Sequence, residues 1–122
     1  MSAVPVVAIV GGGFTGAAVA YHLLNLLPAA AARVVVFEPR ALLGGGLAYD
    51  TDEPVHRINV PAARMTLVPD DDEHFQRWLV EGGFVEGDPQ AVTPEGHVFA
   101  RRGLFGRYVA AQLAPLVEEG RL

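Results

Sequence analysis

The pattern of apolar positions predicts three regular elements in the first 38 residues. Residues 4–10 form a continuous run of apolar, mostly β-branched side chains, typical of a strand buried on both faces of a parallel sheet. Residues 14–27 follow helical spacing and stop before Pro28, which cannot continue a helix. The run 33–37 predicts a second strand, so residues 4–38 form one βαβ unit with a right-handed crossover. The apolar positions of this helix are Phe14, Ala17, Ala18, Tyr21, Leu24 and Leu27.

The pattern is irregular from residue 39 to residue 100. A glycine-rich loop over 42–49 needs no regular element. The spacing of Asp70 and Glu73 is that of a capping box and predicts a short helix to about Val80, ended by glycines at 82 and 83. Residues 84–100 are predicted to be loop; the pattern leaves room for a short hairpin but does not determine the conformation of this segment.

A last helix is predicted over 102–119. Gly120 is its C-cap, and Pro115 is expected to kink the helix or end it early. Its apolar stripe consists of Leu104, Phe105, Tyr108, Val109, Leu113, Leu116 and Val117. Phe105, together with Phe75 and Trp78 of the preceding helix, is predicted to pack in the core rather than to line a substrate pocket.

These elements predict an α/β domain over residues 1–122. It comprises the βαβ unit (4–38), a glycine-rich loop and insert (39–100) and the helix 102–119. Two parallel strands make a poor sheet, and a doubly wound fold would continue with a third. We therefore expect an incomplete amino-terminal portion of a doubly wound parallel sheet. Its exposed edges predict self-association.

Composition narrows the function classes. A hydrophobic fraction of 51% with 14 glycines suits a compact domain, and a net charge of −5 without a lysine-rich stretch argues against nucleic-acid binding. The absence of cysteine excludes disulfides, thiol nucleophiles and thiolate metal sites, so redox chemistry would need a cofactor. The four histidines lack metal-ligand spacing, and no metal site is predicted. Neither a leader nor an apolar run of ~20 residues is evident, which predicts a cytoplasmic protein without membrane contact.

The glycines between the first strand and the helix carry the main chemical signal. Gly11 allows a tight turn, Gly13 lets the backbone approach phosphates, and Gly16 lets the helix lie close to the sheet. The free N–H groups of the helix start would then face a pyrophosphate. Glu38 follows Gly16 by 22 residues and could accept hydrogen bonds from ribose hydroxyls. A dinucleotide site is favoured over a merely structural turn.

Further motifs follow in a specific order. They are Ala20 after the glycine loop, Gly44-Gly45-Gly46-Leu-Ala-Tyr49, His56-Arg-Ile-Asn59-Val-Pro-Ala-Ala-Arg-Met65, Pro69-Asp-Asp, His74-Phe-x-x-Trp78-Leu79 and Arg102-x-x-Phe105-Gly-x-Tyr108. Over nearly its whole length the chain resembles bacterial FAD/NAD(P)-binding proteins of the flavoprotein monooxygenase type, related to N-hydroxylating and Baeyer–Villiger enzymes.

The resemblance implies a Rossmann-like FAD/NAD(P)-binding domain whose first βαβ unit holds FAD. NAD(P)H would serve the longer parent protein, an FAD-dependent oxidoreductase, and this chain alone would be inactive. The segment from Asn59 to Met65 would approach the flavin ring and substrate. Gly45 stands where relatives often have an arginine, so one phosphate contact would be missing. The implied cofactor-binding residues are Gly11, Gly13, Phe14, Thr15, Gly16, Glu38, Pro39, Gly45, Gly46, Leu47, Asn59 and Met65.

Two alternatives stay open. The βαβ unit could hold NAD in a dehydrogenase, since an acid such as Glu38 disfavours the 2′-phosphate of NADP. The chain could also be a non-enzymatic flavin- or nucleotide-binding redox sensor. No residue is predicted to be catalytic, and the substrate is not indicated.

Overall fold

The computed structural model describes residues 3–122, a mixed α/β fold built on one βαβ unit. The strands β1 and β2 pair in parallel, with Val6 opposite Arg33 and Val10 opposite Phe37. The predicted α/β class with a Rossmann-like βαβ unit is thereby confirmed. The elements are β1 (Val6–Val10), α1 (Phe14–Leu26), β2 (Arg33–Phe37), α2 (Gly46–Tyr49), the 3-10 helix η1 (Ala62–Arg64), α3 (His74–Glu81), the 3-10 helix η2 (Pro89–Ala91) and α4 (Arg102–Glu118).

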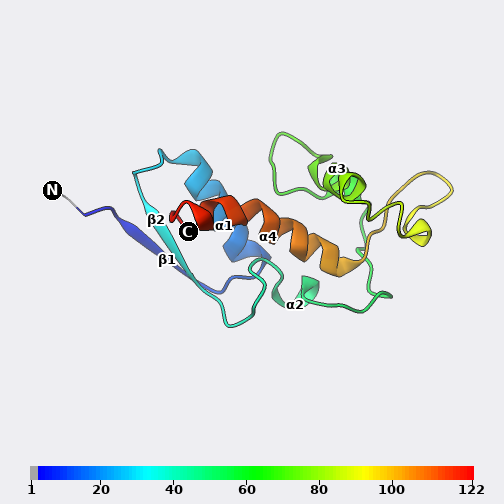
Figure 1. Cartoon of the computed structure of the whole chain (residues 1–122), viewed down its shortest axis with the longest axis horizontal. Coiled ribbons are helices and arrows are strands. Elements are labelled where there is room, and N and C mark those ends of the chain that lie inside the picture. Colours follow the sequence, from blue (N-terminus) through cyan, green and yellow to red (C-terminus); the bar gives the residue numbers. More distant parts are fainter. Residues whose placement is uncertain (1–2) are drawn as a thin grey trace.

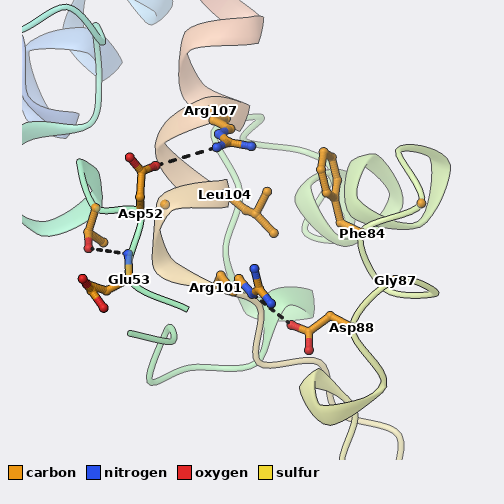
Figure 2. A pocket seen from close by; sticks show the side chains of 11 residues that line it. Asp52, Glu53, Phe84, Gly87, Asp88, Arg101, Leu104 and Arg107 are labelled. Atoms are coloured by element: carbon orange, nitrogen blue, oxygen red, sulfur yellow. Dashed lines mark hydrogen bonds and ion pairs between the residues drawn. The ribbon is translucent and has the colours of Figure 1, made fainter. Parts of the chain in front are cut away.

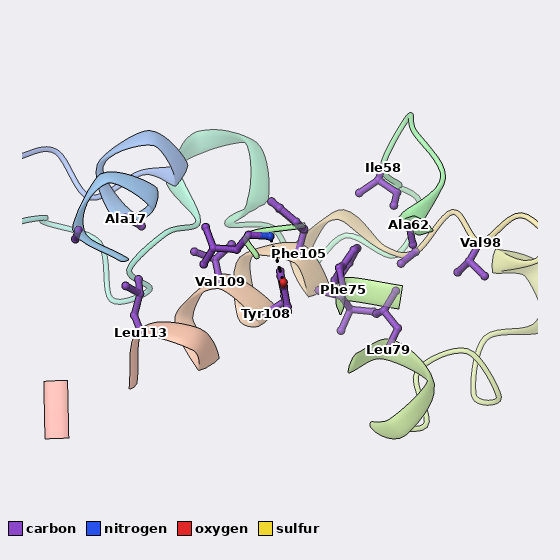
Figure 3. Packing of buried hydrophobic residues seen from close by; sticks show 14 of the residues in the cluster. Ala17, Ile58, Ala62, Phe75, Leu79, Val98, Phe105, Tyr108, Val109 and Leu113 are labelled. Carbon is purple, nitrogen blue, oxygen red and sulfur yellow. Dashed lines mark hydrogen bonds between the residues drawn. The ribbon is translucent and has the colours of Figure 1, made fainter. Parts of the chain in front are cut away.

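The helix α4 runs along the length of the molecule and organises its core. Its carboxyl end lies near β2 and α1, and its amino end lies toward α3 and the segment 83–100 (Figure 1). Small residues of α1, among them Ala17 and Ala20, are fully buried and allow the two helices to approach. Buried side chains continue from Val109 through Tyr108 to Phe75, so one apolar cluster joins the βαβ unit to the insert (Figure 3).

The carboxyl end of α4 closes with a Schellman motif. The N–H of Gly120 donates to the carbonyl of Val117, and that of Arg121 to the carbonyl of Leu116, both at 3.0 Å. Gly120 has φ +74°, the left-handed conformation that glycine adopts without strain. The carbonyl of Arg121 then accepts a hydrogen bond of 2.9 Å from Val34, which fixes this turn beside β2.

Of the two effects expected of Pro115, a kink or an early end of α4, the early end is not observed, because the helix continues to Glu118. Proline removes only one intrahelical hydrogen bond at this point, near the helix end. Leu113 and Leu116 are buried on either side of it and hold the last turn against the core. Val117, predicted on the apolar stripe, is 51% exposed instead.

The prediction that β1 is buried on both faces is also wrong. The strand begins at Val6, and Val6 and Val10 are 59% and 88% exposed. The helices α1 and α4 lie on the same side of the sheet, so in residues 3–122 its other face is uncovered (Figure 1). Self-association through the sheet edges stays a prediction.

The glycine-rich loop, predicted without regular structure, contains the short helix α2. Its backbone rests directly on α4, because Gly103 and Gly106 carry no side chain there. A Cβ atom at Gly106 would lie 2.8 Å from the carbonyl oxygen of Tyr49, and one at Gly103 would lie 2.2 Å from that of Thr51. This close approach joins positions more than fifty residues apart, which no local pattern reveals.

The helix α3 begins at His74, and the predicted capping box at Asp70 is wrong. Glu73 is the N-cap residue and makes no side-chain capping bond. Asp71 is instead held by Arg77, whose guanidinium donates two hydrogen bonds of 2.8 and 3.0 Å to its carboxylate. The prediction that the aromatic side chains pack in the core is confirmed, since Phe75 and Phe105 are buried and Trp78 stacks partly exposed against Phe75.

The segment 84–100 is fastened by one ion pair. Arg57 donates hydrogen bonds of 2.9 and 3.1 Å to the two carboxylate oxygens of Asp88, and a third to the carbonyl of Phe99. An isolated antiparallel bridge between Val92 and Val98 closes a short hairpin, which the sequence left open. The hydrogen bonds from Arg57 lower the pKa of the Asp88 carboxyl.

This ion pair predicts a pH dependence of stability. The pKa of Asp88 is lower in the folded than in the unfolded protein. The ionised carboxylate therefore stabilises the fold fully at pH values above its unfolded pKa, and this stabilisation is lost as the pH falls through its folded pKa. Asp88→Asn should therefore show a shallower fall of unfolding free energy below roughly pH 4, measured by urea denaturation. Asp70→Asn, at an exposed position, is the control; identical profiles for Asp88→Asn and the parent protein would contradict the expectation.

Candidate functional site

The loop between β1 and α1 makes a tight turn at Gly11. Gly11 has φ +96°, a conformation that strongly favours glycine. Its N–H donates a hydrogen bond of 2.9 Å to the carbonyl of Phe37, so β1 and β2 stay paired up to the turn. The chain therefore leaves the sheet abruptly and enters α1 within three residues.

Gly16 lets the first turn of α1 lie against this loop. A Cβ atom at Gly16 would lie 2.0 Å from the carbonyl oxygen of Gly11 and 3.3 Å from Ile9. A real Cβ atom cannot occupy that position, because the carbonyl oxygen is backbone and cannot move aside without displacing the strand. The close helix–strand packing expected at Gly16 is thus visible in the geometry.

Gly12 is a position that the sequence reasoning missed. Its N–H donates a hydrogen bond of 2.7 Å to Oε2 of Glu38. A Cβ atom there would lie 2.7 Å from the Leu43 side chain and 2.8 Å from the Cβ of Glu38, so this position is restricted too, though less than Gly16, whose neighbour is a backbone oxygen. The only sequence signal was its place in the middle of three consecutive glycines, where the dinucleotide fingerprint allows any residue.

The Glu38 carboxylate is held at the end of β2 by backbone donors. Besides the bond from Gly12, its Oε1 accepts a hydrogen bond of 3.0 Å from the N–H of Arg40. Each carboxylate oxygen can accept more than one hydrogen bond, so both keep capacity for a further donor. The half-buried acid is therefore oriented beside the glycine loop while it can still accept hydrogen bonds.

The second glycine cluster, residues 44–46, packs directly on the first. The N–H of Gly44 donates a hydrogen bond of 2.7 Å to the carbonyl of Gly12. A Cβ atom at Gly13 would lie 3.6 Å from the Cα of Gly46, and one at Gly46 would lie 3.3 Å from the Cα of Gly13. Two segments about thirty residues apart in the sequence thus form one continuous backbone surface.

Five other expected site residues lie in or around this surface in different ways. Phe14 packs its ring against Tyr49 and Phe105, with centroids 6.4 and 5.5 Å apart, and so belongs partly to the core. Gly45 is buried and its carbonyl accepts a hydrogen bond from Tyr49. The exposed residues are Thr15, Pro39 and Leu47, the last at 85%.

Within residues 3–122, neither Asn59 nor Met65 forms a hydrogen bond with the two glycine clusters. Asn59 is exposed, whereas Met65 packs against the core. The chain beyond Met65 is fixed by Tyr108, whose hydroxyl oxygen accepts a 3.2 Å hydrogen bond from the N–H of Leu67 and lies 2.7 Å from Nδ1 of His74. Burial raises the pKa of Tyr108.

Two further observations concern the part of the chain that the structure describes. No group of three histidine, aspartate or glutamate side chains gathers there as metal ligands would. None of its helices combines the length and the apolar character needed to cross a membrane.

The Glu38 carboxylate is expected to stabilise the glycine loop. Glu38→Ala leaves the N–H of Gly12 without its acceptor, which should lower the free energy of unfolding by about 1–2 kcal/mol. Glu38→Gln should lose less unfolding free energy than Glu38→Ala, because the amide oxygen of glutamine can still accept the hydrogen bond from the N–H of Gly12. Urea denaturation of the three proteins measures the differences, and an unchanged value for Glu38→Ala would show that the bond does not form.

A tight glycine turn, a helix start packed on it and an acid at the end of the next strand together define a dinucleotide-binding βαβ unit. The model of the FAD-NAD(P)-binding family matches residues 8–121, and the chain belongs to this family. The matched range includes both glycine clusters and α4. No significant match was found among curated proteins or among solved structures.

Proposed function

We propose that this chain binds FAD and forms part of a flavin-dependent oxidoreductase of the monooxygenase type that uses NAD(P)H. The observation that supports FAD is the contact between the two glycine clusters, through the Gly12–Gly44 hydrogen bond and the Gly13–Gly46 approach. A second stretch of side-chain-free backbone extends the phosphate-binding surface, which suits a long cofactor lying across both clusters.

The start of α1 has the properties of an anion-binding helix end. Gly13 is its N-cap and makes no side-chain capping bond, and the first turn carries no acidic residue. The N–H groups of this turn and the positive end of the helix dipole are therefore left for a ligand. A pyrophosphate of the cofactor would accept hydrogen bonds from them, with Gly11, Gly13 and Gly16 allowing its approach.

Glu38 would orient the adenosine end of the cofactor. Its two oxygens, fixed by Gly12 and Arg40, would accept hydrogen bonds from the ribose hydroxyls. The same negative charge would repel a 2′-phosphate, so the proposed ligand at this site has a free 2′-hydroxyl. This requirement is met by FAD and by NAD alike, and the second glycine cluster is what favours FAD.

The remaining proposed contacts lie along and beyond the second cluster. Pro39, Gly45, Gly46 and Leu47 would line the cofactor, with Phe14 and Thr15 at the helix start. Through resemblance alone, the segment from Asn59 to Met65 is proposed to approach the flavin ring. When bound, FAD would supply the redox chemistry, accepting hydride from NAD(P)H and reacting with oxygen. The residues of this chain bind and orient it, and none is proposed as catalytic.

Flavin absorbance and its response to reduced nicotinamide test the proposal. The full oxidoreductase of which this chain is proposed to form part, reconstituted with FAD, should show bound-flavin absorbance that NADH or NADPH bleaches under anaerobic conditions. A colourless protein that binds NAD but not FAD would overturn the proposal in favour of a dehydrogenase module. Bleaching without turnover of any substrate would favour a redox sensor.

A further inference from the structure

A second concave site lies at the amino end of α4. A cavity of about 260 Å³ lies between the segment Thr51–Glu53, the segment 83–88 and the first turns of α4 (Figure 2). It shares no lining residue with the two glycine clusters or with Glu38. The residues that line it have not been used by the proposed dinucleotide site.

Three side chains at the start of α4 form one wall of this cavity. Arg101 is the N-cap residue of α4, and Leu104 and Arg107 lie in its first two turns at a spacing of three residues. Leu104 lies between the two arginines, and Phe84 stands across the cavity from them (Figure 2). The wall thus combines two positive charges with an apolar centre.

Both guanidinium groups keep unused hydrogen-bonding capacity. Nε of Arg101 lies 3.7 Å from the Asp88 carboxylate, which already accepts two hydrogen bonds from Arg57. Nη2 of Arg107 lies 3.8 Å from Asp52, whose side chain is fully exposed. Both distances exceed that of a hydrogen bond, and within residues 3–122 neither guanidinium donates one. Ion pairs this long and this exposed hold their arginines only weakly.

We propose that this cavity binds a small organic carboxylate with an apolar body. The carboxylate would accept hydrogen bonds from one of the two guanidinium groups, whose planar shape matches its two oxygens, and the charge of the other would attract it. The apolar body would lie against Leu104 and Phe84. The three acids that line the cavity, Asp52, Glu53 and Asp88, would repel a ligand with more than one negative charge, so a monoanion is favoured over a phosphate ester.

Benzoate is a suitable probe of this proposal, and backbone amide NMR can locate it. Benzoate should cause saturable shifts at the amides of Gly83, Gly87 and Gly103, which line the cavity, and leave those of Gly11 and Gly13 unchanged. Arg101→Gln and Arg107→Gln should each weaken benzoate binding by about fivefold, the effect of losing a half-exposed charge-assisted hydrogen bond. Benzyl alcohol, of similar shape but without charge, should bind much more weakly.

Two matched variants test whether benzoate affinity depends on the charges that line the cavity or only on the net charge of the protein. Arg33→Gln removes one positive charge at an exposed position of β2 and should leave the benzoate affinity unchanged. Asp52→Asn removes the competing acid at a fully exposed position, where folding is not at risk, and should tighten binding by about twofold. Equal shifts with benzyl alcohol, unchanged affinity in both cavity arginine variants, or no tightening in Asp52→Asn would each overturn the proposal.

Discussion

Gly16→Ala is expected to lower the free energy of unfolding by more than about 3 kcal/mol, beyond the usual range for overpacking a core. The added methyl would lie 2.0 Å from the carbonyl oxygen of Gly11. Relief would require α1 to move off the loop, which would also weaken its packing on α4. Urea denaturation followed by circular dichroism measures the loss, and dinucleotide binding should fall with it.

Gly13→Ala is the matched control for this experiment. Gly13 has φ −70°, which any residue adopts, and its added methyl would meet only the Cα of Gly46 at 3.6 Å, an ordinary contact. The unfolding free energy of this variant should stay within about 0.5 kcal/mol of the parent value. If Gly16→Ala proved as stable as Gly13→Ala, the first turn of α1 could not lie as close to the carbonyl oxygen of Gly11 as it does in the structure.

Gly13→Val is expected to abolish cofactor binding while the fold persists. The two methyl groups of valine would cover the surface where the helix start and the second glycine cluster meet, and a pyrophosphate could no longer reach the backbone N–H groups. The cost in stability should be about 1 kcal/mol, because φ is suitable and the position lies at the helix entry. Flavin content after reconstitution with FAD measures the effect.

Stability must be measured on the same Gly13→Val sample, so that loss of binding is not mistaken for loss of fold. A folded variant without flavin supports the proposed phosphate site. A folded variant that retains flavin would show that the glycine loop is only a turn. Glu38→Gln offers a second comparison, since its amide oxygen can still accept from Gly12 while the bond to Arg40 and the negative charge at the proposed ribose contact are lost.

The elements set by local sequence were predictable. Unbroken apolar runs gave β2 its observed bounds, and Pro28 and Gly120 marked the ends of α1 and α4 to within one residue. Such signals act over a few residues, since proline lacks an N–H and glycine tolerates positive φ. The glycine loop was recognisable for the same reason, because its turn, helix start and acid recur at fixed spacing.

The features set by distant contacts were not predictable. The helix α2 depends on the space left by Gly103 and Gly106. The helix α3 begins only at His74, without the predicted side-chain cap, and Asp71 before it pairs with Arg77. The importance of Gly12 depends on Leu43, which the sequence places in a different segment. The exposure of β1 depends on which helices cover the sheet, whereas its composition reports only that the strand is apolar.

The contact between Gly13 and Gly46 has a consequence for how the chain can vary. Each glycine leaves room for the other, so a methyl group at either position occupies the same gap. An alanine at Gly13 could be accommodated, whereas one at Gly46 would be strained by its φ of +55°. Alanine at both positions would collide, and the penalty should exceed the sum of the single ones. The two positions are therefore epistatic, and a lineage that enlarges one of them gives up the freedom to enlarge the other.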